Sequence, residues 1–140
     1  MQKQELVAIR LGNESDKNFI LATMLRGLYY GNTWFGMIPK NIFMQCYHTI
    51  LERLIAHPDA KVTVACLKDD PEVVLGYSIS RTTQGVTILD YMFVKSAWRR
   101  IGIAKSLMPE NVFAVTHLTR PGASIMKSKL PNVPYNPFLL

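Results

Sequence analysis

Cysteine is scarce in this 140-residue chain, and its two cysteines, Cys46 and Cys66, both lie inside apolar segments. Neither belongs to a C-x-x-C or similar spacing, and the three histidines are scattered along the chain. The sequence therefore offers no set of ligands typical of a structural metal site. We expect two reduced, buried thiols and no bound metal.

Long hydrophobic runs are also absent. No apolar stretch reaches the roughly 18 residues that a membrane-spanning helix needs, and the first five residues lack the apolar block of a signal peptide. With 49% hydrophobic and 19% charged residues, no segment is polar enough to be disordered by its composition. These features predict a soluble, cytoplasmic protein that folds as one domain over residues 1–140.

Positive charge is present in excess. Sixteen Lys and Arg residues against ten Asp and Glu give a formal net charge of +6. An excess of this sign favours acidic partners, which include nucleic acids, anionic membrane surfaces and phosphorylated cofactors. Lys95, Arg99, Arg100 and Lys105 crowd one short segment, whereas the other basic residues are spread out. This crowding predicts a local anion site.

The first half of the chain shows one strand pattern and two helix patterns. Residues 5–11 alternate as a strand, and residues 16–28 and 40–56 repeat their apolar positions with helical spacing. The aromatic stretch 29–36 between the two helices predicts a packed loop. Pro58 stops the second helix.

The second half predicts three consecutive strands, a short helix, a further strand and a weak helix, over residues 61–67, 73–80, 86–94, 100–108, 111–118 and 123–130. Short turns between the three strands indicate an antiparallel meander. A proline-rich end is expected to lie extended. The order β-α-α-β-β-β-α-β-α predicts an α+β fold, in which helices flank a central, mostly antiparallel, twisted sheet.

Residues 93–104 run from a strand end through a basic loop into a helix start. Such a turn directs unpaired backbone N–H groups and the positive end of the helix dipole to one place, which suits a phosphate. Gly102 permits close approach because it has no Cβ, and the small Ala104 keeps the helix entry open. A solvated loop is the alternative, because charge runs usually face water.

The pattern Arg99-x-x-Gly102-x-Ala104 resembles the cofactor-binding signature R/Q-x-x-G-x-G/A of the GNAT acetyltransferases. The order of elements over about residues 5 to 130 is also similar to that family, and short GNAT-like proteins of this kind occur in tailed bacteriophages. The resemblance implies acetyl-CoA as cofactor, with its pantetheine arm along the end of the strand 86–94. The cofactor-binding residues that it implies are Phe93, Val94, Arg99, Arg100, Ile101, Gly102, Ile103, Ala104 and Lys105.

In such enzymes the amine attacks the thioester directly, so the protein supplies positioning, an oxyanion donor from a strand amide near Phe93 or Val94, and proton transfer. Asp90 is the candidate general base, because a carboxylate within an apolar strand is costly unless it is paired or used. We expect it to share a strand face with Met92 and Val94. An ion pair or hydrogen bond to a neighbour is its alternative role.

Two features depart from the family. GNAT enzymes often carry a tyrosine in the helix after the fifth strand to protonate the leaving thiolate, whereas residues 123–130 contain none. Ser124, Ser128 or Tyr135 could substitute. The chain also ends before the usual last hairpin, so we expect an exposed sheet edge or one paired in a homodimer. Both departures put catalytic competence in question.

Acceptor recognition in the family falls to the loop between the first two helices and to the C-terminal end. The matching aromatic residues are Tyr29, Tyr30, Trp34 and Phe35, which either line a substrate pocket or pack as core between the helices. His117, in the middle of a strand, is expected to be structural.

Two functions from different classes follow. The first is transfer of an acetyl group from acetyl-CoA to a primary amine of a small molecule, peptide or protein. The second is a non-catalytic GNAT-fold module that grips a macromolecular partner, such as a host protein, through its aromatic loop or basic face. Direct nucleic-acid binding is a weaker option, because no recognised motif accompanies the charge.

Overall fold

The computed structural model describes residues 2–140 and contains a five-stranded sheet in the order β1-β2-β3-β4-β5. The first four strands pair antiparallel, and β5 pairs parallel with β4. The strands are β1 (Val7–Leu11), β2 (Ala60–Leu67), β3 (Val74–Thr83), β4 (Val86–Val94) and β5 (Val112–Val115). The predicted α+β fold and its antiparallel meander are confirmed.

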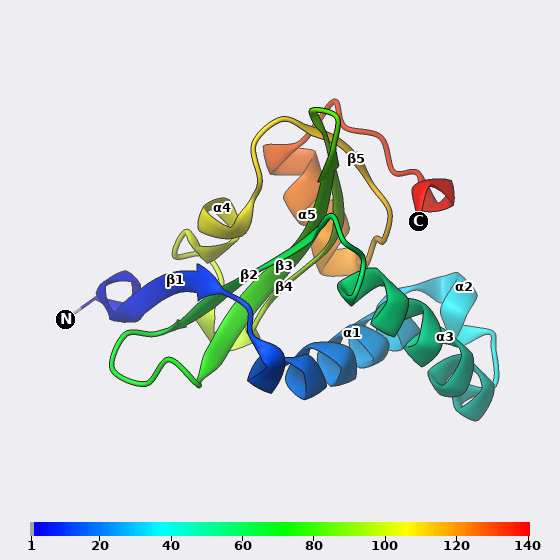
Figure 1. Cartoon of the computed structure of the whole chain (residues 1–140), viewed down its shortest axis with the longest axis horizontal. Helices are drawn as coiled ribbons and strands as arrows, with labels where there is room; N and C mark the ends of the chain where they lie inside the picture. The colour runs from blue at the N-terminus through cyan, green and yellow to red at the C-terminus, as the bar shows by residue number, and fades with distance from the viewer. Residues whose placement is uncertain (1) are drawn as a thin grey trace.

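Helices cover both faces of the sheet (Figure 1). One layer contains α1 (Lys17–Gly31), α2 (Thr33–Gly36) and α3 (Lys40–Ile55), and the other contains α4 (Ile103–Leu107) and α5 (Arg120–Lys129). Single 3₁₀ turns occupy Lys3–Leu6, Glu14–Asp16, Ser96–Trp98 and Pro137–Leu139. Within residues 2–140, no helix has the length and apolar character needed to cross a membrane.

The two faces of the sheet carry separate hydrophobic clusters. Met24, Leu28 and Leu51 are fully buried where α1 and α3 cover β2, β3 and β4. On the opposite face, Ile103 and Leu107 of α4 pack on a second cluster that includes Ala65, Leu75 and Val94. Burial of apolar surface on both sides fixes β4 firmly between the layers.

The starts of α2 and α5 differ from the sequence prediction. The aromatic stretch 29–36 contains the end of α1 and the short α2, because the Asn32 side-chain oxygen accepts hydrogen bonds from the backbone N–H groups of Trp34 and Phe35. Helix α5 begins at Arg120 instead of residue 123, because the Thr119 hydroxyl accepts from the Gly122 N–H at 3.2 Å.

The buried stripe of α3 is narrower than its apolar pattern predicts. Phe43, Leu51 and Leu54 are buried, whereas Ile42 and Cys46 are exposed. The prediction that both cysteines are buried is therefore wrong for Cys46 and correct for Cys66. Only one face of α3 packs on the sheet, so the apolar residues beside that face remain open to solvent.

The C-terminal tail pairs with the outer edge of β5. The Val115 N–H donates to the Pro134 carbonyl at 3.0 Å, and the Asn136 N–H donates to the Val115 carbonyl at 2.8 Å. A parallel bridge thereby joins Val115 and Tyr135. The tail covers this edge at one position, which reduces the number of unpaired backbone groups there.

A β-bulge interrupts β4 at Asp90. Ile79 of β3 pairs with Tyr91 and the next residue, Ser80, pairs with Leu89, so Asp90 has no partner on β3. One extra residue reverses the alternation of side chains along the strand. Asp90 faces Arg81 of β3, whereas Met92 and Val94 pack toward α4. The prediction that Asp90 shares a face with Met92 and Val94 is therefore wrong.

Candidate functional site

β4 and β5 diverge halfway along β4. Their register runs from Thr87 and Val112 to Leu89 and Val115, and a last backbone hydrogen bond joins the Thr116 N–H to the Leu89 carbonyl at 3.2 Å. Beyond it β4 continues beside β3, while the chain after β5 turns away into α5. The outer edge of the second half of β4 therefore faces open space.

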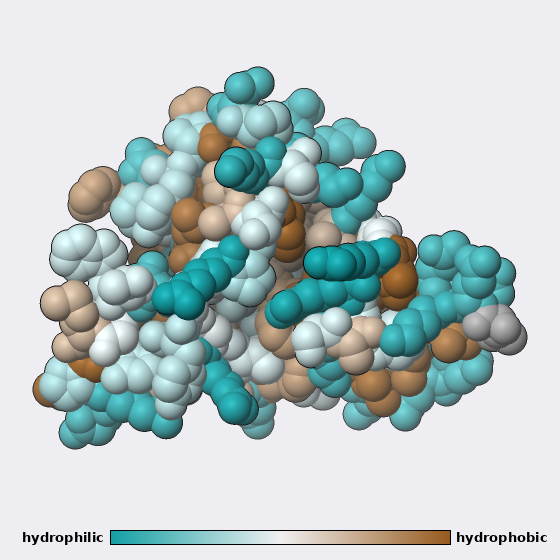
Figure 2. Space-filling model, turned by 180° about the vertical axis from the view of Figure 1, so that it is seen from behind, coloured by the Kyte–Doolittle hydropathy of each residue, from teal (hydrophilic) through white to brown (hydrophobic). Residues whose placement is uncertain are grey.

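A cavity of about 1220 Å³ occupies this gap. Its walls come from the C-terminal half of α1, the second half of β4, the turn before α4, and the start of α5. Figure 2 shows the molecule from behind, where long hydrophilic side chains reach over hydrophobic surface in a central hollow. The cavity is large enough for an extended ligand of cofactor size.

The turn Arg99–Gly102 has the backbone geometry of an anion site. Arg100 and Gly102 have positive φ angles of 66° and 91°, and the N–H groups of Arg100, Ile101 and Gly102 donate to no acceptor within residues 2–140. A Cβ at Gly102 would meet no atom within 4 Å, so a ligand has room against this backbone.

The dipole of the short helix α4 can contribute less to anion binding than the sequence predicts. α4 begins at Ile103, not at Arg100, and has five residues, so its dipole is small. An anion at this turn would instead meet free amides and cationic side chains. Eight of the nine residues that the resemblance implies line the cavity; Ile101 does not, and packs toward the hydrophobic cluster under α4.

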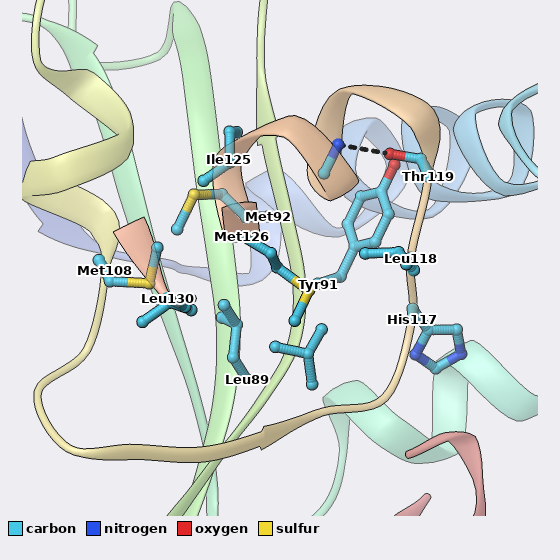
Figure 3. A pocket seen from close by; sticks show the side chains of 12 residues that line it. Leu89, Tyr91, Met92, Met108, His117, Leu118, Thr119, Ile125, Met126 and Leu130 are labelled. Carbon is cyan, nitrogen blue, oxygen red and sulfur yellow. Dashed lines mark hydrogen bonds between the residues drawn. The ribbon is translucent and has the colours of Figure 1, made fainter. Parts of the chain in front are cut away.

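Tyr91 lines the cavity and was missed by the sequence argument. Its side chain is 5% exposed, and burial raises the pKa of its phenol to about 12 despite the opposing effect of Arg99. Every buried side-chain polar atom in residues 2–140 has a hydrogen-bond partner, and the Tyr91 hydroxyl has none. That oxygen must therefore be open to the cavity; Figure 3 shows the ring rising from β4 toward Thr119.

Gly27 of α1 permits this position of Tyr91. A Cβ at Gly27 would overlap the Tyr91 hydroxyl oxygen, and one at Gly31 would lie 3.1 Å from the Thr119 Cβ. Both glycines therefore allow α1 to approach β4 and the chain that leads into α5. Close packing at these two turns brings the end of α1 to the mouth of the cavity.

A smaller cavity of about 30 Å³ lies between β4 and α5. Leu89, Met92, Met126 and Leu130 are among its lining residues (Figure 3). α5 has no buried residue, so it rests on the sheet through partly exposed apolar side chains.

Asp90 does not line the large cavity; it is fully buried in an ion pair. Arg81 Nε donates to Asp90 Oδ2 at 2.7 Å, and Arg81 Nη2 donates to Oδ1 at 2.8 Å. The Thr116 hydroxyl donates to Oδ1 at 2.7 Å. Arg81 also donates to the Leu139 carbonyl at 2.8 Å, which ties the tail to the sheet. This arrangement favours the alternative role of Asp90, a structural pair.

His117 extends the same buried network. Its Nε2 lies 2.6 Å from the Tyr47 hydroxyl, and its Nδ1 lies 3.1 Å from the Asp90 carbonyl oxygen. Burial lowers the pKa of the imidazole below its usual value, although the Asp90 charge opposes this effect. A neutral, hydrogen-bonded imidazole is in keeping with the structural role expected for His117.

The three residues proposed for proton transfer are not brought together. Ser124 is exposed and lines the cavity from α5, whereas Tyr135 lies in the tail bridge and lines no part of it. The Ser128 hydroxyl donates to the Ile125 carbonyl at 3.4 Å, also away from the cavity.

The four aromatic residues proposed for acceptor binding divide into two groups. Tyr29 and Phe35 pack on Phe43 in the core. Tyr30 is 61% exposed and lines the cavity, and Trp34 is 78% exposed outside it. Only Tyr30 is therefore placed to touch a ligand in the cavity. Within residues 2–140, no group of three or more His, Cys, Asp and Glu side chains is placed to hold a metal ion.

Solved structures of acetyltransferases are similar to this fold. A predicted acetyltransferase from Clostridium acetobutylicum, solved with acetyl-CoA, gives a TM-score of 0.60 at 12% identity, over 87% of both chains. A Pyrococcus furiosus protein assigned as an acetyl transferase gives 0.59 at 17% identity, over 91% of this chain and 79% of that one.

Ribosomal-protein-alanine N-acetyltransferase from Brucella melitensis gives a TM-score of 0.57 at 18% identity, over 89% of this chain and 90% of that one. No protein-family model and no curated protein sequence matches the chain. At these identities the likeness is one of structure, and the chain has the fold of these acetyltransferases.

Proposed function

We propose that the protein transfers an acetyl group from acetyl-CoA to a primary amine. The observation that carries the proposal is the cavity that joins the diverging strands β4 and β5 to the turn Arg99–Gly102. The turn offers free amides, two arginines and open space at Gly102 for a pyrophosphate. The apolar floor beside Met92, Phe93 and Val94 suits a pantetheine arm.

The groups in the cavity fit a direct transfer. Bound acetyl-CoA supplies a thioester, which the acceptor nitrogen attacks as the C–S bond breaks. The nitrogen loses one proton and the thiolate gains one, so the balance needs one proton donor in the cavity. We assign that role to Tyr91, because its open hydroxyl stays protonated well above neutral pH. The Tyr91 phenolate then takes up the proton that the nitrogen loses, which restores the phenol. Ser124 is the other hydroxyl proposed for this role that lines the cavity.

Calorimetric titration of acetyl-CoA and CoA, with the Gly102→Glu variant, tests the proposal. The unmodified protein should bind each in the micromolar range with one site per chain. Gly102→Glu should abolish binding, because a carboxylate at the turn would occupy the pyrophosphate position and repel it.

Gly85→Glu is the matched control for this substitution. Gly85 also has a positive φ, of 78°, and a Cβ there would also meet nothing within 4 Å. Both variants therefore carry the same backbone strain, but Gly85 lies in the turn between β3 and β4 and does not line the cavity. Unchanged CoA affinity in Gly102→Glu, or equal loss in both variants, would refute the assigned site.

A protein-binding module is the second candidate function. Trp34 and Met37 are 78% and 74% exposed between α1 and α3, and exposed aromatic surface of this kind is enriched in interfaces. A partner captured equally well by the unmodified protein and by Gly102→Glu would favour this function. A partner lost together with CoA binding would argue against an independent module.

A further inference from the structure

All charged side chains that line the large cavity have one sign. Among the described residues 2–140, none of the lining residues is acidic. Within the described chain no lining cation forms an ion pair either, since the pairs there are Arg10–Asp16, Lys17–Glu52, His48–Glu52 and Arg81–Asp90. The six lining cations are Arg26, Arg99, Arg100, Lys105, Arg120 and Lys129.

Lys129 is the last residue of α5, and the other five cations form two groups. Arg99, Arg100 and Lys105 lie on the turn and α4, which is the proposed pyrophosphate end. Arg26 comes from α1, and Arg120 is the first residue of α5.

The path of α1 shows that the second group lies away from the turn. Phe19, near the start of α1, contacts Phe93, and the Lys95 Nζ lies 5.3 Å from the Phe19 ring centroid. Gly27 then faces Tyr91, and Gly31 faces Thr119. α1 therefore runs from the strand end that leads to the turn toward the start of α5. Arg26 precedes the glycine that faces Tyr91, and Arg120 follows Thr119 at the far end.

We infer that the acceptor amine carries an anionic group, a carboxylate or a phosphate, which Arg26 and Arg120 bind. The inference rests on the proposed acetyl transfer. The pyrophosphate accounts for the cations of the turn. The 3′-phosphate of the cofactor is on the adenosine, beyond the pyrophosphate and away from the thioester, so it leaves Arg26 and Arg120 without a counter-charge. Arginine is well suited to binding carboxylate and phosphate through paired donors. A polycationic acceptor would be repelled by the same field.

The positive field also explains how the acceptor loses a proton without a carboxylate base. Like charge disfavours the ammonium form of a bound amine and therefore lowers its pKa. The anionic group secures the molecule, while the surrounding cations favour the neutral, nucleophilic nitrogen. The ammonium proton passes to water, so this step needs no acidic side chain at the cavity.

Matched acceptor pairs test the inference in acetyl-transfer assays. β-Alanine is compared with β-alaninamide, and O-phosphoethanolamine with ethanolamine, by following release of free CoA thiol at saturating acetyl-CoA. The anionic member of at least one pair should have a kcat/KM about tenfold higher, which corresponds to about 1.4 kcal/mol. A preference within the β-alanine pair would indicate a carboxylate, and a preference within the O-phosphoethanolamine pair would indicate a phosphate.

Arg26→Met and Arg120→Met should each remove most of this preference, while the change in calorimetric affinity for CoA should be smaller than the change in preference. Lys127→Met is the matched control, because Lys127 is an exposed cation of α5 that does not line the cavity. Equal or faster transfer to the neutral members of both pairs would overturn the inference. So would a preference that survives in both arginine variants.

Direct titration separates this inference from the proposed function. O-Phosphoethanolamine and β-alanine are titrated into the protein, each beside its neutral counterpart, with binding followed by NMR chemical-shift changes at the end of α1 and the start of α5. Tighter binding of an anionic probe, lost in Arg26→Met or Arg120→Met, supports the anion subsite even if no acetyl transfer occurs. No difference within either pair contradicts the subsite, whatever the result with CoA.

Discussion

Tyr91 and Tyr77 are neighbouring buried tyrosines with different surroundings. Burial raises the pKa of both phenols. The Tyr77 hydroxyl lies 2.7 Å from the Thr23 hydroxyl and donates to the Ile20 carbonyl at 3.2 Å. Within residues 2–140 the Tyr91 hydroxyl has no protein partner and opens on the cavity. Since buried phenols normally find a partner, this hydroxyl is free to form a hydrogen bond with water or with a molecule bound in the cavity.

Replacing Tyr91 with Phe should therefore lower kcat with little effect on CoA affinity. Loss of a positioned proton donor typically costs about 10²-fold or more, and steady-state assays with calorimetry separate the two effects. Tyr77→Phe is the matched control, because it should lower the free energy of unfolding by about 1 kcal/mol without a comparable loss of rate. Full activity in Tyr91→Phe would exclude the phenol as proton donor.

At the scale of elements, the sequence predicted the layers well and the bulge in β4 not at all. Turn residues and alternating patterns were sufficient for the meander, because they act locally. The bulge is accompanied by contacts of Asp90 with Arg81 on β3 and with Thr116, the residue after β5. Contacts of this kind leave no trace in the alternation of apolar and polar residues. The sequence therefore placed Asp90 on the same face of β4 as Met92 and Val94, which is incorrect.

The site could be predicted from the sequence only in part. The basic turn and Gly102 are adjacent in the chain, so the segment was visible as a motif. Arg26 and Arg120 come from α1 and α5, and only the fold places them at the same cavity. The start of α4 was also missed, since the positive φ of Arg100 is rare for a residue with a side chain.

The ion pair that joins Arg81 of β3 to Asp90 of β4 predicts a stability effect for Asp90→Asn. The change leaves the largely buried Arg81 charge without compensation and should lower the free energy of unfolding by about 3–5 kcal/mol, measured by urea denaturation. The double variant Arg81→Met with Asp90→Met should lose less, because it leaves no unpaired charge.

Activity of the folded Asp90→Asn protein separates the two roles considered for this carboxylate. A structural pair predicts a kcat within about twofold of the unmodified protein once the folded fraction is corrected for, because the carboxylate does not line the cavity. A loss of about 10²-fold in the folded protein would instead assign Asp90 as the general base.

At the scale of the whole molecule, the net charge of +6 is unevenly distributed. Asp16 and Asp90 each hold an arginine in a bidentate pair outside the cavity, whereas six cations around the cavity have no acidic partner in the described chain. Mutual repulsion of those cations opposes folding of the free protein. A bound polyanion would relieve that repulsion and contribute its own contacts.

This distribution predicts opposite effects of salt on the free protein and on its complex. Raising KCl from about 20 mM to about 200 mM shortens the Debye length to below about 10 Å, which screens the cations from one another. The Tm of the free protein should rise by about 4 °C, equivalent to roughly 1 kcal/mol for a domain of this size. The affinity for CoA should fall over the same range, since salt also screens the cations from the phosphates.

Lys105→Glu provides the control, because it places one acidic group among the lining cations and should reduce both salt effects. Differential scanning calorimetry and isothermal titration at each salt concentration measure the two quantities on the same samples. A Tm independent of KCl in the unmodified protein would show that the cations are too far apart to interact. That result would refute a continuous positive field around the cavity. The anion site at the Gly102 turn would still be tested separately by the CoA titration.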